Sequence, residues 1–289
     1  MNKLKKLTWF DYLLVLIFLL VLLMTFYPFL NVLAISLNDS LETIKNINII
    51  VPSKWTLSNY RYVFQDKDLI NAAELSVART VIGAFVSVIS TSMLAYALAR
   101  KDFIARKLFT VIFVITMYVS GGIIPDYLLT VQTLGLKNNF LVYILPGLIW
   151  VYNMILIRSY IQGLPDALEE AAMLDGANDL QIFFKIIFPI CKPVVATVTL
   201  FYAVGQWNSF MDTYLYAKKL PTLQYKLYEI MSQANMQIDT HSNTSTAVSI
   251  TPMSIRMAVT VVATVPILVV YPFVQKYFVG GMTLGSVKA

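Results

Sequence analysis

Residues that could carry catalytic or metal chemistry are scarce in this sequence. Its 289 residues include one cysteine, Cys191, and one histidine, His241. These counts exclude an intrachain disulfide, a cluster of histidine metal ligands, and any Ser-His-Asp site that does not use His241. His241 lies in a polar stretch and is expected to be a solvated loop residue. The sequence has no Gly-x-x-x-x-Gly-Lys-Ser/Thr phosphate loop and no His-Glu-x-x-His pair, so it lacks the usual ATP and zincin-type protease motifs.

The segment 163–179 has the pattern of a short helix that ends in a sharp turn. Pro165 suits the first helical position, and Gly176 suits the position just past a helix end. The helix dipole favours negative charge in the first turns, which here hold Asp166, Glu169 and Glu170. The predicted helix has about ten residues, too few to span a bilayer. Beyond the turn, Asn178 can cap a second helix.

One face of this short helix is apolar. Its members recur at helical spacing: Leu164, Ala167, Leu168, Ala171 and Leu174. Ala171 and Ala172 are small, so another protein could approach the helix closely. The residues leave two interpretations open, an interfacial helix that packs on its own bundle or a docking site for a partner.

The composition shows what must position this segment. Hydrophobic residues make up 58% of the chain and charged residues 13%, against roughly 25% charged in a typical soluble domain. A single soluble core could not hide so much apolar surface, so the sequence predicts an all-α membrane protein. The net charge of +6 is then explained by basic loops on one side of a membrane, without nucleic acid.

Six apolar segments are long enough to be transmembrane helices, and we treat 1–289 as a single transmembrane domain. The predicted spans are 12–30, 80–98, 108–124, 140–157, 193–211 and 257–274. The first run is longer than a signal-peptide core and lacks an Ala-x-Ala ending, so we expect it to be retained. The long connections are 31–79, 158–192 and 212–256.

Charge distribution predicts the orientation. The short connection between the second and third spans contains Arg100, Lys101, Arg106 and Lys107. Short positive loops stay in the cytoplasm, which places both termini and 158–192 inside and the segments 31–79 and 212–256 outside.

Polar and aromatic side chains inside or next to spans are candidates for a solute path. They are Tyr118, Asn153, Trp207, Asn208 and Tyr214. Aromatic faces pack on sugar rings and amides bond hydroxyls. The alternatives are an interfacial anchor for a Tyr or Trp and a helix–helix hydrogen bond for an Asn.

The segment 170–189 resembles the signature loop of ABC-importer permeases. The family pattern is Glu-Ala-Ala-x-x-x-Gly-x9-Ile-x-Leu-Pro, and this chain has Glu170-Ala171-Ala172, Gly176, Ile186 and Pro189, with Phe188 in place of Leu. Asp175-Gly176-Ala177, Trp207-Asn208-Ser209-Phe210 and the C-terminal 271–278 are similar to the carbohydrate branch, in particular MalG-like permeases and their LplC-like relatives.

The resemblance implies the MetI-like permease fold of type I importers and a mechanism. Glu170, Ala171, Ala172, Asp175 and Gly176 would form the coupling helix and turn that dock on a cytoplasmic ATPase dimer. ATP and magnesium would bind to that partner, so this chain would have no cofactor and would not itself be an enzyme. The expected partners are a second, paralogous permease, an extracellular solute-binding protein and an oligosaccharide, in a bacterial plasma membrane.

Three alternatives remain at the level of the sequence. The first is an ABC importer for a non-sugar solute, since the docking motif is shared across importer types. The second is a stand-alone secondary carrier, which would more often show ionisable groups within its spans and related halves. The third is a membrane enzyme or scaffold, and the spans offer no convergent carboxylates or histidine for an enzyme.

Overall fold

The computed structural model describes residues 8–47, 49–238 and 251–283. Over these ranges the regular elements are helices, and the β-structure is limited to a single bridge between Asn38 and Trp55. A helix satisfies its backbone hydrogen bonds within one segment, so it suits a chain that enters a bilayer. His241 lies outside the described residues.

Three helices are long and apolar enough to cross a membrane, and each overlaps a predicted span, the first, second or sixth. They are α1 (Trp9–Ser36), α4 (Lys67–Ala99) and α14 (Pro252–Thr283). At the start of α1, the Thr8 backbone N–H donates to the Asp11 carboxylate at 2.7 Å, which satisfies a donor that the helix leaves free.

Two further candidate spans are bent pairs of helices. The first pair is α5 (Arg106–Tyr118) with α6 (Ile123–Leu128) and η1 (Leu129–Thr133), bent by 114°. In the break Gly122 has a φ of +86°, which glycine adopts without a side-chain clash. In the second, the helical segment 179–190 meets α11 (Lys192–Asn208) at 85°. Counting each pair as one span gives up to five candidates among the described residues.

Pro146-Gly147 predicts a kink in the fourth span, 140–157, and the structure shows a full interruption of the helix there. This range opens with the single turn η2 (Phe140–Tyr143), and the α-helix α7 (Val151–Ile161) starts only at Val151. Pro146 lies between them, and a proline donates no backbone hydrogen bond and disfavours helix in the residue before it. The 11 residues of α7 extend about 16 Å, less than the hydrocarbon core of about 30 Å.

Eight elements remain among the described residues, and α8 and α9 are the two helices of the predicted docking segment. The eight are α2 (Ser40–Lys45), α3 (Ser58–Gln65), α8 (Ala167–Leu174), α9 (Asp179–Ile182), η3 (Phe183–Ile187), α10 (Phe188–Ile190), α12 (Met211–Tyr216) and α13 (Leu223–Ile238).

The chain divides into two compact units. One comprises Met1–Ile70 with Leu227–Val265, and the other comprises Asn71–Lys226 with Pro266–Ala289. In the first unit, buried Asn59 organises the irregular chain after α1, because its Nδ2 donates to the Ser36 and Asn38 carbonyls at 3.0 Å each.

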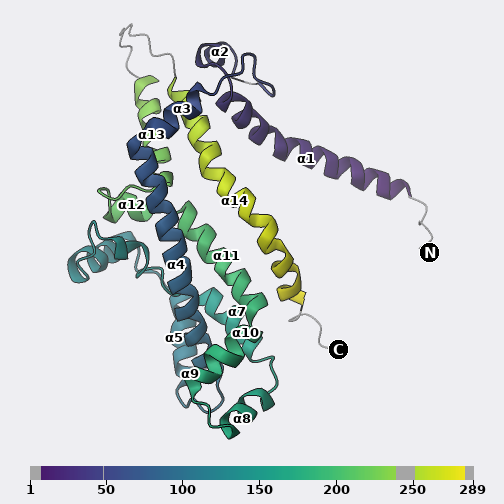
Figure 1. Cartoon of the computed structure of the whole chain (residues 1–289), viewed down its shortest axis with the longest axis vertical. Helices are drawn as coiled ribbons and strands as arrows, with labels where there is room; N and C mark the ends of the chain where they lie inside the picture. The colour runs from purple at the N-terminus through teal and green to yellow at the C-terminus, as the bar shows by residue number, and fades with distance from the viewer. Residues whose placement is uncertain (1–7, 48, 239–250, 284–289) are drawn as a thin grey trace. The chain divides into compact units, whose positions relative to one another are not determined.

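The second unit contains every site residue that the sequence predicts. Its apolar core joins α4, α7, α9 and α11 through side chains that include Leu98, Met154, Ile157, Ile182 and Val198. Figure 1 shows α8 and α9 beyond the end of α4 that leads into α5 and near the end of α11 that follows α10. The predicted docking segment therefore lies at one end of this helical core.

Candidate functional site

The segment 163–182 folds as a helix, a turn and a second capped helix. Gly176 follows α8 with a φ of +80°, so the predicted glycine turn is confirmed. Asn178 caps α9, as predicted, because its Oδ1 accepts from the Gln181 backbone N–H at 2.9 Å. The Gln181 Oε1 accepts from the Asn178 N–H at 3.0 Å and completes the capping box. Helix α8 begins at Ala167, two residues after Pro165.

Helix α8 has one face toward its own unit and one face exposed. Ala172 is 6% exposed and belongs to the apolar core of the second unit. Glu170 and Ala171 are exposed, and Leu174 is 89% exposed. The sequence left open whether this helix packs on its own bundle or docks on a partner, and Ala171 and Ala172 differ in this respect. Ala172 packs on the bundle, while Ala171 lies on the exposed face.

The basic loop between α4 and α5 forms ion pairs with this segment. Arg100 Nη1 donates to Asp179 Oδ1 at 2.6 Å, and Lys101 forms an ion pair with Asp166. The Arg100 guanidinium also donates to the Tyr96 hydroxyl at 3.1 Å and pairs with Asp102 at 2.6 Å. Two of the basic residues that predicted the orientation are therefore bonded to the segment around α8.

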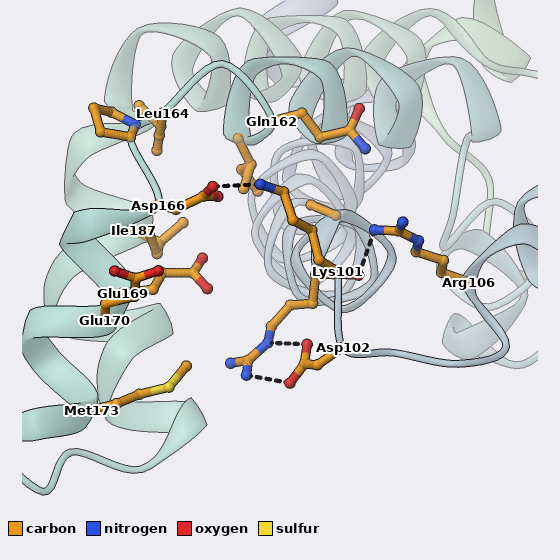
Figure 2. A pocket seen from close by; sticks show the side chains of 14 residues that line it. Lys101, Asp102, Arg106, Gln162, Leu164, Asp166, Glu169, Glu170, Met173 and Ile187 are labelled. Atoms are coloured by element: carbon orange, nitrogen blue, oxygen red, sulfur yellow. Dashed lines mark hydrogen bonds and ion pairs between the residues drawn. The ribbon is translucent and has the colours of Figure 1, made fainter.

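A groove of about 710 Å³ separates the loop from α8. Figure 2 shows Lys101 reaching across it to Asp166, with Glu169, Glu170 and Met173 along the opposite wall. One wall carries positive charge and the other negative charge.

Two carboxyl groups in this region have shifted pKa values. Burial raises the pKa of Glu169 above its usual value, because the charged form loses solvation. Hydrogen bonds from Arg100 lower the pKa of Asp102. Glu169, the neighbour of the motif glutamate, is therefore the partly buried acid of α8, while Glu170 is exposed.

The structure brings together only two of the predicted solute-path residues. Asn153 and Trp207 line a largely apolar hollow of about 690 Å³, with Trp150 and Gly205 also in its wall. Asn153 is 1% exposed, and neither atom of its side-chain amide has a hydrogen-bond partner among the described residues.

The other three predicted solute-path residues lie outside that lining. Tyr118 is 82% exposed at the end of α5, Asn208 is the last residue of α11, and Tyr214 lies in α12. The Lys218 ammonium lies 4.8 Å from the centroid of the Tyr214 ring.

Sequence reasoning missed a buried charge in the second unit. Arg79 was assigned to the end of an outer loop, yet it lies within α4 and is 2% exposed. Asp212, assigned to the start of the other outer loop, pairs with it at 2.5 Å. The available signal was an arginine in an apolar helix, which needs a partner when it is buried.

The described residues contain no group of three or more histidine, cysteine, aspartate or glutamate side chains placed to hold a metal ion.

Comparison with known proteins identifies the family. A family model described as "Binding-protein-dependent transport system inner membrane component" matches residues 89–284, more than half of the chain. The polygalacturonan/rhamnogalacturonan transport system permease protein YtcP of Bacillus subtilis is 40% identical over 96% of this chain and 98% of its own. Protein LplC of the same organism is 39% identical over 91% of this chain and 90% of its own.

A solved structure agrees with these relatives. It is the crystal structure of a bacterial ABC transporter involved in the import of the acidic polysaccharide alginate. One of its chains aligns with a TM-score of 0.80 and 28% identity, over 94% of this chain and 99% of that chain. The predicted MetI-like permease fold is thereby confirmed at the level of architecture. The chain belongs to the family of binding-protein-dependent transport system inner membrane components.

Proposed function

We propose that this chain is the permease subunit of an ABC importer that carries an oligosaccharide. It forms the path together with a second, paralogous permease, and an extracellular binding protein delivers the solute. Support for a carbohydrate comes from relatives that transport carbohydrates. They include YtcP, the alginate importer and the arabinooligosaccharides transport system permease protein AraQ of Halalkalibacterium halodurans, which is 30% identical over 91% of this chain.

The exposed face of α8 carries this proposal. Ala171 lets a groove on the ATPase approach closely, and Glu170 offers a carboxylate to a basic group there. Asp175 and Gly176 form the turn that separates α8 from α9. Movement of α8 reaches the core of the second unit through buried Ala172 and through the ion pairs of Arg100 and Lys101. ATP and magnesium are bound by the separate ATPase dimer.

The six-span arrangement belongs to the same proposal. α1, α4 and α14 supply three spans, the bent pairs that contain α5 and α11 supply two more, and the interrupted segment 140–161, which ends with α7, supplies the sixth. The segment 158–192 lies in the cytoplasm. The ion pairs of Arg100 and Lys101 support this orientation, because they place the basic loop on the same side as α8. Both termini are then cytoplasmic, and 31–79 and 212–256 are extracellular.

The first experiment is a pull-down of the complete chain from its native membrane, with mass spectrometry of the proteins that accompany it. We expect an ATPase, a second permease and a binding protein. Glu170→Lys should remove the ATPase, whereas Glu74→Lys, a charge reversal on an exposed side chain of α4, should retain it. Retention of the ATPase by Glu170→Lys would contradict the role of α8.

The recovered binding protein then decides the solute class. Saturable binding of oligosaccharides supports the proposal, whereas binding of only non-sugar solutes would identify the other type of importer. Solute uptake by the purified chain in vesicles, driven by an ion gradient without ATPase, would instead indicate a stand-alone carrier.

A further inference from the structure

The buried guanidinium of Arg79, within the apolar helix α4, contacts three other side chains. Its Nη2 donates to Asp212 Oδ2 at 2.5 Å, and its Nη1 donates to Asp212 Oδ1 at 3.2 Å. Its Nε and Nη2 donate to Gln206 Oε1 at 3.1 and 2.9 Å. The guanidinium carbon also lies 4.3 Å from the centroid of the Tyr143 ring. This bidentate pair fixes the orientation of the Asp212 carboxylate relative to the Arg79 guanidinium, as well as their distance.

Hydrogen bonds extend from this cluster to the start of α13. The Tyr143 hydroxyl lies 3.1 Å from Thr213 Oγ1 and donates to the Leu220 carbonyl at 2.6 Å. Thr213 Oγ1 lies 3.2 Å from Thr222 Oγ1. The Leu223 backbone N–H donates to Ser76 Oγ, one turn from Arg79 on α4, at 2.8 Å. Both ends of the segment 212–223 are therefore fastened to α4.

The position of Arg79 along α4 places the cluster at the opposite end of the unit from α8. Helix α4 ends at Ala99, next to the basic loop that forms ion pairs with the segment around α8. About 30 Å of helix separates Arg79 from Ala99. That distance matches the hydrocarbon thickness of a bilayer, about 30 Å. With α8 in the cytoplasm, Arg79 lies at the outer boundary, where 212–256 begins.

We propose that Arg79 is a positioning residue that holds α12 and the first turn of α13 in one orientation for docking of the extracellular binding protein. The inference rests on the proposed function. Its physical reason is that a segment held in its bound orientation loses less conformational entropy when a partner docks. The pair with Asp212 also needs both partners, because removing one leaves an uncompensated buried charge.

The test measures ATP hydrolysis by the complete complex in nanodiscs against the concentration of the solute-loaded binding protein that co-purifies with the wild type. Arg79→Lys keeps the positive charge but loses the planar guanidinium that bonds Asp212 through two nitrogens. Asp212→Asn keeps the shape of the side chain and loses its negative charge. For each, we expect the half-stimulating concentration to rise about tenfold, a usual size for coupling between sites. The maximal rate should stay within about twofold, since the variants affect docking and not turnover.

Tyr202→Phe is the matched control. It removes buried hydrogen bonds between helices of the same unit, to Thr91 Oγ1 at 2.7 Å and the Trp150 N–H at 2.8 Å, away from Arg79. Its half-stimulating concentration should equal that of the wild type. If Arg79→Lys instead lowers the maximal rate and the amount of assembled complex at an unchanged half-stimulating concentration, the pair only stabilises the fold and the proposal is overturned.

Hydrogen exchange on the complete chain in nanodiscs provides a second measurement without the binding protein. Arg79→Lys should speed exchange of the backbone amides of 213–226 by about tenfold and leave those of α8 unchanged. Equal exchange in wild type and variant would overturn the positioning role. Absence of any stimulating binding protein for the wild type would contradict the proposed function instead, and the exchange result would still decide whether Arg79 holds this segment.

Discussion

At the scale of single residues, Gly205 allows the closest packing around Trp150. A Cβ atom at Gly205 would lie 2.4 Å from Trp150 Cη2, whereas one at Gly147 would lie 3.6 Å from Trp150 Nε1. We expect Gly205→Ala to destabilise the chain by about 1–3 kcal/mol, the usual cost of overpacking. Gly147→Ala should have little effect, because 3.6 Å is an ordinary contact. Thermal unfolding of the two purified variants checks this, and equal melting temperatures would contradict the packing argument.

Glu169 gives a residue-scale prediction about pH. Because burial raises its pKa in the folded chain, the folded state binds this proton more tightly than the unfolded state. The charged carboxylate therefore lowers stability when the pH is above the folded pKa. We expect Glu169→Gln to raise the melting temperature at neutral pH. The gain should shrink as the pH falls from the raised pKa of the folded state toward the ordinary value of 4.5, and it should vanish below 4.5, where both states bind the proton.

Glu170→Gln is the control, since that side chain is exposed on the same helix and the substitution makes the same change of charge. A gain for Glu169→Gln that did not depend on pH would show that charge burial is not its cause.

At the scale of elements, the turn between α8 and α9 depends on the backbone of Gly176. Its φ is +80°, and a Cβ there would meet nothing within 4 Å, so a side chain is disfavoured only by the backbone conformation. Gly176→Ala should cost about 1–2 kcal/mol, with weaker recovery of the ATPase in the pull-down. Gly176→Asn should retain more ATPase, because asparagine adopts this conformation more readily. A larger loss for asparagine than for alanine would indicate a clash with the partner instead.

At the scale of the whole molecule, the proposed topology can be tested with single cysteines. Cys191→Ala removes the natural thiol, after which Trp55→Cys and Ile104→Cys place thiols at sites that are 67% and 99% exposed. In intact cells, a membrane-impermeant maleimide should label Trp55→Cys. It should label Ile104→Cys only after the membrane is opened, because the proposed topology places Arg100–Arg106 on the cytoplasmic side. The reverse pattern would invert the topology.

Local patterns in the sequence determined much of the fold and part of the site. The apolar runs identified α1, α4 and α14, and Gly176 and Asn178 identified the turn and the cap between α8 and α9. These features depend on residues within a few positions of each other, so one sequence suffices to read them. Pro146-Gly147 predicted a kink in 140–157, but not that the interruption would separate η2 from α7 over 144–150, because the total hydrophobicity of the range favoured one span.

Only the tertiary structure decided which residues from distant segments meet. The pairing of Arg79 with Asp212 spans 133 positions, and the bond of Arg100 to Asp179 spans 79. Helical periodicity grouped Ala171 with the apolar face of α8, but packing buried Ala172 and left Ala171 exposed. The physical reason is that hydropathy and helical periodicity specify which side of a helix is apolar, whereas contacts depend on how separate helices pack, and packing involves the whole chain at once.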